Sequence, residues 1–308
     1  MQGRHTVCHI LKQKFVFFSF ASELEMLQQI NHDCIVRIHG WTRWRNSVAL
    51  VMEYLPGGNL NKLVRNPECC VADVLRLRIC TEIARAISFL HSLDENKWLV
   101  HGDIKPENVL LTGDLHCKLA DFGAAKLKAH SAKALSASET DSDMQEYTPT
   151  YAAPERLFEV PAELTKEQDT YSYGLIIFVV LTGRAPDDEF HCLEAYCQAI
   201  TRGKRPSTAS IEENKSSEVA SSETAIANVL QSLMCRCWHQ EPWMRPDMSS
   251  AHAELEVKLQ KQDQTEIKEN VEHILRHFNA NELHFKRELC SELHLFDLER
   301  KAFLRGTT

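Results

Sequence analysis

The stretch that decides the fold begins at residue 101 and reads His101-Gly102-Asp103-Ile104-Lys105-Pro106-Glu107-Asn108-Val109-Leu110-Leu111. It is followed closely by Ala120-Asp121-Phe122-Gly123. Two apolar runs, Val109 to Leu111 and Cys117 to Leu119, predict short strands beside these polar residues. The segment therefore presents an aspartate, a lysine and an asparagine on one loop and a second aspartate on the next.

These residue types suit phosphoryl transfer from a nucleotide that carries a metal ion. The reaction needs a carboxylate that orients the attacking hydroxyl, a cation that offsets charge on the phosphoryl group, and oxygen ligands for Mg²⁺. The segment supplies them in that order as Asp103, Lys105, Asn108 and Asp121. Either motif alone could be an ordinary polar turn or a chance tripeptide, but the two together favour the chemical interpretation.

Further motifs make the sequence resemble the eukaryotic protein kinase superfamily from Glu23 to about Leu259. They are Thr148-Pro149-Thr150-Tyr151-Ala152-Ala153-Pro154-Glu155, Asp169-x-Tyr171-Ser172-x-Gly174, Cys237-Trp238 and Arg245-Pro246. The resemblance implies an α+β, two-lobed kinase-like fold with an incomplete small N-lobe and a mainly helical C-lobe. It also implies ATP and Mg²⁺ as cofactors and proteins as substrates.

The resemblance implies a role for single residues. Asp103 would orient the substrate hydroxyl, and Lys105 would steady the γ-phosphate of ATP. Asn108 and Asp121 would bind Mg²⁺. The residues expected to contact the nucleotide are Glu23, Glu53, Leu55, Leu110 and Asp121, with Glu23 on the regulatory helix. Outside this site, Asp169 would hold the loop around Asp103, and Arg245 would pair with Glu155.

The type of kinase can be narrowed from three features. Lys105 two residues after Asp103, and Thr148 before a proline, are typical of serine/threonine-specific enzymes. The Cys237-Trp238 and Arg245-Pro246 motifs are typical of tyrosine kinases and of the tyrosine-kinase-like group. In combination they resemble that group, which includes the receptor-interacting protein kinases. The predicted function is a serine/threonine protein kinase in intracellular signalling.

Gly102 departs from the family pattern, which has arginine before the catalytic aspartate. In the family that arginine pairs with a phosphorylated residue of the activation loop. A glycine there removes the cation that phosphorylation would recruit. The resemblance then implies a kinase that is not switched on by this route.

A larger departure lies ahead of Glu23, where no glycine-rich strand–turn–strand precedes the regulatory helix. The family lysine that contacts phosphate should lie on the strand just upstream. A strict count from Val7 places Ile10 at that position, a one-residue deletion places His9 there, and Lys12 or Lys14 would need a shifted register. We expect either an N-terminally truncated product of an active gene or a catalytically impaired pseudokinase that acts as a scaffold.

The apolar periodicity predicts the order of elements and the domains. Strands are expected at Thr6–Leu11, Phe15–Phe18, Ile35–Ile38 and Ser47–Met52, and helices at Ser19–Ile30, Leu60 to about Pro67, Val71–Leu93, Tyr171–Leu181, Ala225–Trp238 and Met248–Leu259. Residues 129–144, rich in Ser, Ala, Asp and Glu, predict a mobile loop. The kinase-like domain would span 1–259, divided into a partial N-lobe (1–55) and a C-lobe (56–259). Residues 260–308 would be a helical extension that could bind a signalling partner.

Composition excludes several classes of protein. Hydrophobic residues make up 44% and charged residues 25% of the 308 residues, which is ordinary for a globular protein. The net charge of −8 argues against an electrostatic nucleic-acid binder. No apolar run approaches the length of a membrane span. Eleven scattered cysteines, an odd number, indicate reduced thiols and a cytoplasmic location.

Overall fold

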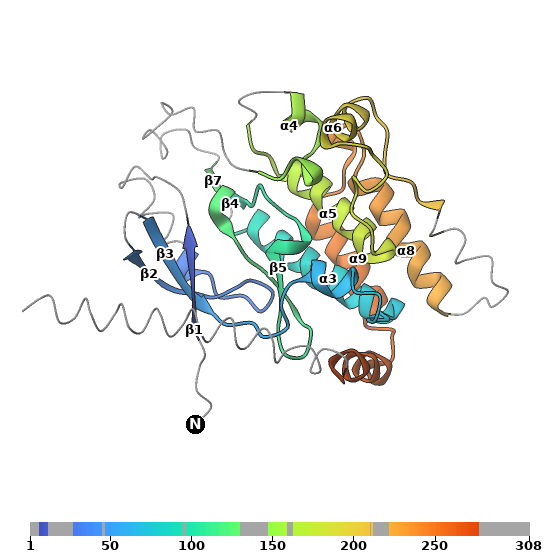
Figure 1. Ribbon diagram of the computed structural model, residues 1–308, viewed down its shortest axis with the longest axis horizontal. Helices are drawn as coiled ribbons and strands as arrows, with labels where there is room; N and C mark the ends of the chain where they lie inside the picture. Colours follow the sequence, from blue (N-terminus) through green and yellow to red (C-terminus); the bar gives the residue numbers. More distant parts are fainter. Residues whose placement is uncertain are drawn as a thin grey trace, which may run out of the picture.

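A three-stranded antiparallel sheet forms the N-terminal part of the chain. The computed structural model describes residues 6–11, 27–44, 47–94, 97–129, 147–158, 163–209, 211 and 222–276. The strands are β1 (Thr6–Leu11), β2 (Ile38–Trp44) and β3 (Ser47–Glu53), and their order in the sheet is β1-β3-β2. Figure 1 shows this sheet at one side of the molecule, away from most of the helices. The predicted strands Thr6–Leu11 and Ser47–Met52 are confirmed as β1 and β3, which pair with each other.

The strand predicted at Ile35–Ile38 is wrong in its limits, because β2 begins only at Ile38. The residues before it pair instead with a strand of the other lobe. The Val36 amide donates to the Leu119 carbonyl at 2.9 Å, and the Leu119 amide donates to the Cys34 carbonyl at 2.9 Å. This segment therefore joins the two lobes rather than extending the sheet.

The helical part is built around α5 (Lys166–Thr182), which is buried from Gln168 to Leu181. Because α5 is apolar on nearly all sides, other helices can pack around it. It contacts α3 (Asp73–His91) and α8 (Ser222–Cys237), and α3 in turn packs on α9 (Met248–Leu259). The shorter helices are α2 (Leu60–Val64), α4 (Pro154–Phe158) and α6 (Leu193–Thr201). The predicted α+β arrangement with a mainly helical second lobe is confirmed.

Gly174 allows the close approach of α5 and α8. A Cβ atom at this position would lie 3.0 Å from both Cys237 Cβ and the Trp238 backbone nitrogen. Across the other face of α5, the Tyr173 hydroxyl donates to the Cys80 carbonyl of α3 at 2.9 Å. The central helix is thus fixed to both of its neighbours.

Two short antiparallel strand pairs position the loops that carry Asp103 and Asp121. Strand β4 (Lys97–Val100) pairs with β7 (Lys126–Ala129), and β5 (Val109–Leu111) pairs with β6 (Cys117–Leu119), both antiparallel. The loop from residue 101 to 108 therefore runs from β4 to β5, and the loop that carries Asp121 runs from β6 to β7. The two loops meet, because His101 of the first contacts Ala120 and Phe122 of the second.

The beginning of the C-terminal extension packs on the helical lobe. Residues 264–276 are helical, and Ile267, Val271 and Ile274 are buried in the main core. Asn270 of this helix accepts a hydrogen bond from the Ala72 amide at 3.1 Å and donates to the Cys70 carbonyl at 3.0 Å. Ala72 precedes α3 and has no side chain that can cap it, so Asn270 supplies polar partners from a distant segment.

We expect Asn270→Ala to lower the free energy of unfolding by about 1 kcal/mol, because it removes two hydrogen bonds at a partly buried helix start. Urea denaturation of the full chain measures the change. Glu269→Ala, at an exposed position on the same helix, is the matched control and should have a smaller effect. Equal stability of Asn270→Ala and the unchanged protein would show that the docking of this helix does not depend on Asn270.

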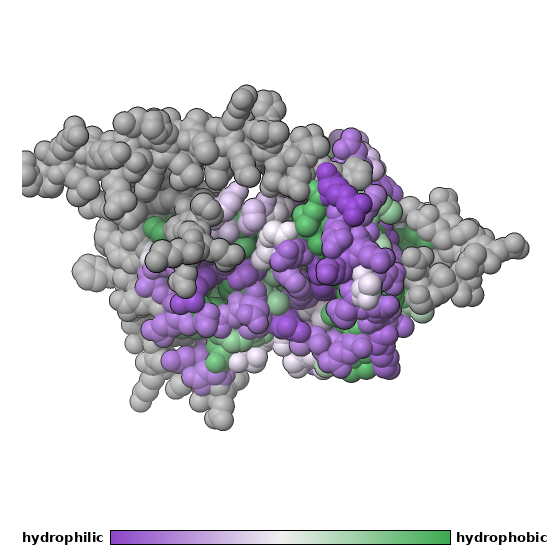
Figure 2. All heavy atoms as spheres, turned by 90° about the horizontal axis from the view of Figure 1, so that it is seen from below, coloured by the Kyte–Doolittle hydropathy of each residue, from purple (hydrophilic) through white to green (hydrophobic). Residues whose placement is uncertain are grey.

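Some predicted elements lie outside the described residues. These are the strand Phe15–Phe18, the helix Ser19–Ile30 except residues 27–30, of which 27–29 are helical, the loop 129–144 except its first residue, and residues 277–308 of the extension. The face in Figure 2 is largely hydrophilic, with hydrophobic residues in small separate patches. Among the helices that the structure describes, none combines the length and apolar character needed to cross a membrane.

Candidate active site

Asp103 lies at the centre of a cluster of short polar contacts. Its Oδ2 accepts hydrogen bonds from Lys105 Nζ at 2.6 Å and from Asn108 Nδ2 at 3.1 Å. Its Oδ1 accepts one from the Thr148 amide at 3.0 Å. Lys105 Nζ also donates to the Thr148 hydroxyl at 2.7 Å. The structure therefore brings the three predicted loop residues together with Thr148, which lies some forty residues further along the chain.

The backbone of this loop is held by a buried carboxylate. Asp169, which is 1% exposed on α5, accepts hydrogen bonds from the amides of His101 at 2.8 Å and Gly102 at 2.9 Å. The His91 ring nitrogen Nε2 lies 2.9 Å from Asp169 Oδ2. Burial by itself raises the pKa of the Asp169 carboxyl. The hydrogen bonds with His91 and the Gly102 amide, together with the electrostatic interactions with His91 and His101, outweigh this effect, so the pKa is lowered. Asp169 is therefore an ionised anchor for the loop.

We expect Asp169→Ala to destabilise the fold by roughly 1–3 kcal/mol near pH 7, because buried amides of His101 and Gly102 lose their acceptor. The lowered pKa sets the sign of the pH dependence. The stabilisation is fully present above the pKa of the unfolded carboxyl, near 4, and is lost as the pH falls through the lower folded value. Thermal unfolding of wild type and variant between pH 3 and pH 7 measures this as a difference that narrows in acid. A constant difference would contradict the account.

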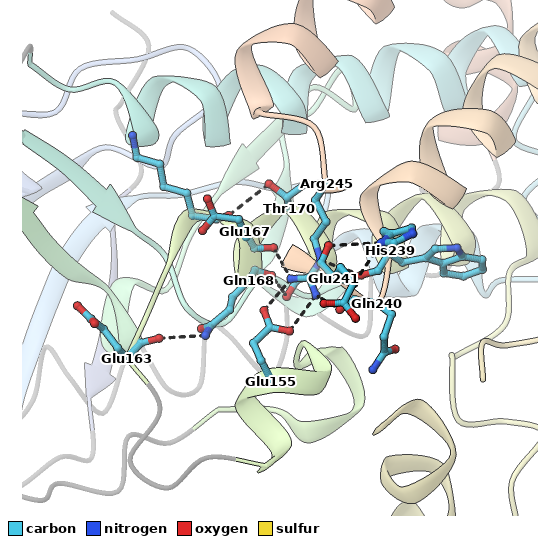
Figure 3. Close-up of polar contacts among 12 residues, drawn as sticks. Glu155, Glu163, Glu167, Gln168, Thr170, His239, Gln240, Glu241 and Arg245 are labelled. Carbon is cyan, nitrogen blue, oxygen red and sulfur yellow. Dashed lines mark hydrogen bonds and ion pairs between the residues drawn. The ribbon is translucent and has the colours of Figure 1, made fainter. Parts of the chain in front are cut away.

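An ion pair between the buried Arg245 and Glu155 holds the segment that follows Thr148, and Figure 3 shows its polar contacts. The Arg245 guanidinium makes a bidentate pair with Glu155, at 2.7 Å and 2.8 Å. Its side chain is 0% exposed, and its remaining donors reach the carbonyls of His239, Gln240 and Glu167. Complete pairing of this kind is what a buried charge requires. The pair that the resemblance implied is present.

Asp121 lies in a tight turn at the start of the second loop. Its φ of +61° is left-handed, and its Oδ1 accepts a hydrogen bond from the Gly123 amide at 3.3 Å. The neighbouring Phe122 ring is buried, with its centroid 5.1 Å from that of His101. The His101 Nε2 atom lies 3.0 Å from the Ala120 carbonyl. These contacts hold the two loops together.

A pocket lies between the sheet and the two loops. Its lining residues are Val36, Ile38, Leu50, Met52, Glu107, Asn108, Leu110, Ala120, Asp121 and Phe122. The sheet and Leu110 make an apolar wall that suits a flat aromatic base, while Asn108 and Asp121 make a polar end that suits phosphates and a cation. Asn108, Leu110 and Asp121 are predicted site residues, whereas Val36, Ile38, Leu50 and Glu107 were not predicted to line a pocket. The spacing of Leu50 and Met52, two residues apart on one strand, was the available signal.

The oxygen ligands fit a Mg²⁺ ion that arrives with a nucleotide. Asn108 Nδ2 also donates to the Asp103 carbonyl at 2.8 Å, so two acceptors hold the amide nitrogen and Oδ1 is the atom that can bind the ion. Within the described ranges, no three His, Cys, Asp or Glu side chains are grouped to hold a metal ion. A nucleotide-borne Mg²⁺ needs only one or two protein ligands, because phosphates and water complete its shell.

The other predicted nucleotide contacts have different outcomes. Glu53 Oε1 accepts hydrogen bonds from the Arg37 amide at 2.9 Å and Lys118 Nζ at 2.6 Å, so its carboxylate holds the lobes together and does not line the pocket. Leu55 packs on the small cluster of Val36, Met52 and Ala120, which line the pocket, but is not itself a lining residue. Leu110 lines the pocket directly, and Glu23 lies outside the described residues.

The pairing of β1 with β3 distinguishes positions 9 and 10, the two candidate positions for the family lysine that contacts phosphate. His9 is paired with Leu50 and Val7 with Met52, whereas Ile10 is paired with Ala49. Residues opposite each other in an antiparallel pair share a face of the sheet, and successive residues alternate between faces. Position 9 is therefore in register with the pocket-lining Leu50, and position 10 is in register with Ala49, which does not line the pocket.

Comparison with known proteins gives a consistent result. The family model for the protein kinase domain matches residues 9–255. Receptor-interacting serine/threonine-protein kinase 1 of Homo sapiens is 27% identical over 86% of this chain and 38% of its own length. Receptor-interacting serine/threonine-protein kinase 3 of Homo sapiens is 30% identical, over 74% and 42% respectively. Receptor-interacting serine/threonine-protein kinase 4 of Mus musculus is 34% identical, over 72% and 26%.

The chain thus spans less than half the length of each of these relatives. The family model covers both loops of the site, the anchor Asp169 and the Glu155–Arg245 pair. The chain belongs to the protein kinase family, and within it is similar to the receptor-interacting kinases of the tyrosine-kinase-like group.

Proposed function

We propose that this chain is a serine/threonine protein kinase that transfers the γ-phosphate of ATP to hydroxyl groups of protein substrates in signalling. The observation that carries the proposal is the position of Asp103. Its carboxylate is bonded to Lys105 at 2.6 Å and to the Thr148 amide at 3.0 Å, beside a pocket that contains Asn108 and Asp121. This is the arrangement that in-line transfer to a hydroxyl requires.

Each residue has a role that its chemistry allows. Asp103 orients the substrate hydroxyl and accepts its hydrogen bond. The ammonium group of Lys105 lies next to this carboxylate and offsets negative charge on the transferring phosphoryl group. Asn108 and Asp121 would hold Mg²⁺, which on binding neutralises phosphate charge and fixes the phosphate geometry. The apolar wall with Met52 and Leu110 would hold the base, with main-chain groups of Glu53 and Leu55 as its hydrogen-bonding partners.

The preference for serine and threonine rests on Lys105 and Thr148. The lysine donates to the Thr148 hydroxyl at 2.7 Å, which fixes the start of the segment expected to dock the substrate. The names of the three relatives cited above agree with this specificity. We propose a kinase domain over 1–259, with lobes at 1–55 and 56–259. The extension 260–308 would dock on the domain through its first helix and could bind a signalling partner beyond it.

A catalytically impaired pseudokinase that acts as a scaffold is the second candidate. The observation that favours it is the register of β1, which places a histidine rather than a lysine beside the pocket-lining Leu50. A histidine is mostly neutral near pH 7 and so contributes little charge to phosphate binding. The two candidates differ in whether bound Mg-ATP is turned over.

Asp121→Asn tests the metal site of the proposed function. We expect Mg-ATP to bind about tenfold more weakly, because the variant loses a charge-assisted contact worth about 1.4 kcal/mol. The measurement is the shift in melting temperature on adding Mg-ATP, compared with ATP and EDTA. Asp114→Asn, an exposed aspartate in the β5–β6 turn, is the matched control. An unchanged Mg-dependent shift in Asp121→Asn would count against the assignment.

A further inference from the structure

Arg156 is a buried arginine that contacts two segments at the active site, one at Gly102 and the other at Tyr147. It lies in α4 and is 6% exposed. Its Nη1 donates a hydrogen bond to the Gly102 carbonyl, and its Cζ lies 4.1 Å from the centroid of the Tyr147 ring. A guanidinium stays charged in proteins, so this is a cation buried between a carbonyl and an aromatic face.

The first partner, Gly102, has a left-handed backbone conformation and directly precedes Asp103. Its φ is +77°, and a Cβ atom there would lie 2.9 Å from the Ala124 carbonyl oxygen and 3.1 Å from Leu164. Position 102 therefore has no room for a side chain. Gly102 is buried, and buried backbone N–H and C=O groups need hydrogen-bond partners. The amide bonds to Asp169 at 2.9 Å, and the carbonyl bonds to Arg156.

The second partner, Tyr147, directly precedes Thr148. Thr148 touches the site twice, through its amide to Asp103 at 3.0 Å and through its hydroxyl to Lys105 at 2.7 Å. Arg156 thus contacts the residue before Asp103 and the residue before Thr148. The Arg156 guanidinium therefore links Gly102 to Tyr147. The distance between these two residues determines whether Asp103 and Thr148, which follow them, can form their hydrogen bond.

We propose that Arg156 is a positioning residue for phosphoryl transfer, which aligns Asp103 with Thr148 from α4 and supplies the cation that position 102 cannot carry. This inference rests on the proposed kinase function. Its partners are a carbonyl oxygen and a neutral ring, so the alignment does not need a phosphate group. The alternative is that Arg156 only stabilises the lobe.

Steady-state kinetics separate the two roles. Arg156→Met should lower kcat by about a hundredfold, because small displacements of reacting groups have effects of that size, while the KM for ATP stays unchanged. Arg156→Lys keeps the charge and a donor but loses the planar stacking, so it should recover part of kcat. Arg184→Met, a partly exposed arginine paired with Glu189, is the control and should leave kcat unchanged.

Amide hydrogen exchange tests the same contact without activity. In Arg156→Met, exchange should rise at the Gly102, Asp103 and Thr148 amides and stay unchanged in the centre of α5. Unchanged exchange at these amides, or a loss of kcat no greater than in Arg184→Met, would overturn the proposal. A rise spread over the whole lobe would also overturn it, in favour of a structural role. If the wild-type chain transferred no phosphate, the kinase proposal would fail, and the exchange pattern would still decide whether Arg156 holds the loop.

Discussion

Replacing Asp103 by asparagine is expected to lower the rate of phosphoryl transfer by about 10²–10⁴-fold, the range that a positioned acid–base group contributes. Asparagine keeps the shape and one oxygen, so the hydrogen bond from the Thr148 amide to Oδ1 can remain. It loses the negative charge that pairs with Lys105 at 2.6 Å and that orients the substrate hydroxyl. The effect should therefore fall on kcat and not on nucleotide affinity.

The measurement is incorporation of labelled phosphate into a generic serine/threonine protein substrate, with Mg-ATP affinity determined on the same samples. Asp114→Asn makes the same chemical change at an exposed site and should retain full activity. Activity of Asp103→Asn within a few-fold of the wild type would remove Asp103 from the mechanism. A matching loss of nucleotide affinity would show that the substitution damages the pocket instead.

His9→Lys is expected to strengthen nucleotide binding by about tenfold to a hundredfold. In the family, a strand lysine ahead of the regulatory helix contacts the α- and β-phosphates. A charge-assisted contact of this kind is worth about 1.5–3 kcal/mol, which corresponds to that change in affinity. The register supports position 9 for it, because His9 is opposite the pocket-lining Leu50. The rate of transfer should rise in parallel.

Ile10→Lys is the matched control, since it adds the same charge one residue away, at a position paired with Ala49, which does not line the pocket. Calorimetric titration with Mg-ATP gives the two affinities directly. A gain in Ile10→Lys but not in His9→Lys would mean that the strict count along the sequence identifies the lysine position and that the register argument is wrong. Strong binding by the unchanged chain would mean that Lys12 or Lys14 already fills the role.

The parts of the fold that could be predicted are those with strong local patterns. The helix expected at Val71–Leu93 is α3, Asp73–His91, and the strand expected at Ser47–Met52 is β3, Ser47–Glu53. Both have apolar residues at a regular period, so their limits agree within two residues. Strands β4 and β7 were missed because each has only four residues and forms only by pairing with the other, far away in the sequence.

The residues of the candidate site also divide into those that a local sequence pattern identifies and those whose contacts form only in the folded chain. Asp103, Lys105, Asn108 and Asp121 carry their chemistry in their residue types and spacing, and the structure brings them to one place. The use of the Glu53 carboxylate by Arg37 and Lys118 depends on contacts across the lobes, and no pattern in the sequence reports it. The same holds for Arg156, whose two partners come from segments that meet only in the folded chain.

The most direct test of serine/threonine kinase activity is transfer of labelled γ-phosphate from Mg-ATP to matched peptides that differ only in carrying serine, threonine or tyrosine. The chain and its Asp103→Asn variant are compared, each with and without His9→Lys. The account predicts slow labelling of the serine and threonine peptides, faster labelling with His9→Lys, and none above background whenever Asp103→Asn is present. Labelling of the tyrosine peptide alone, or labelling that survives Asp103→Asn, would contradict it.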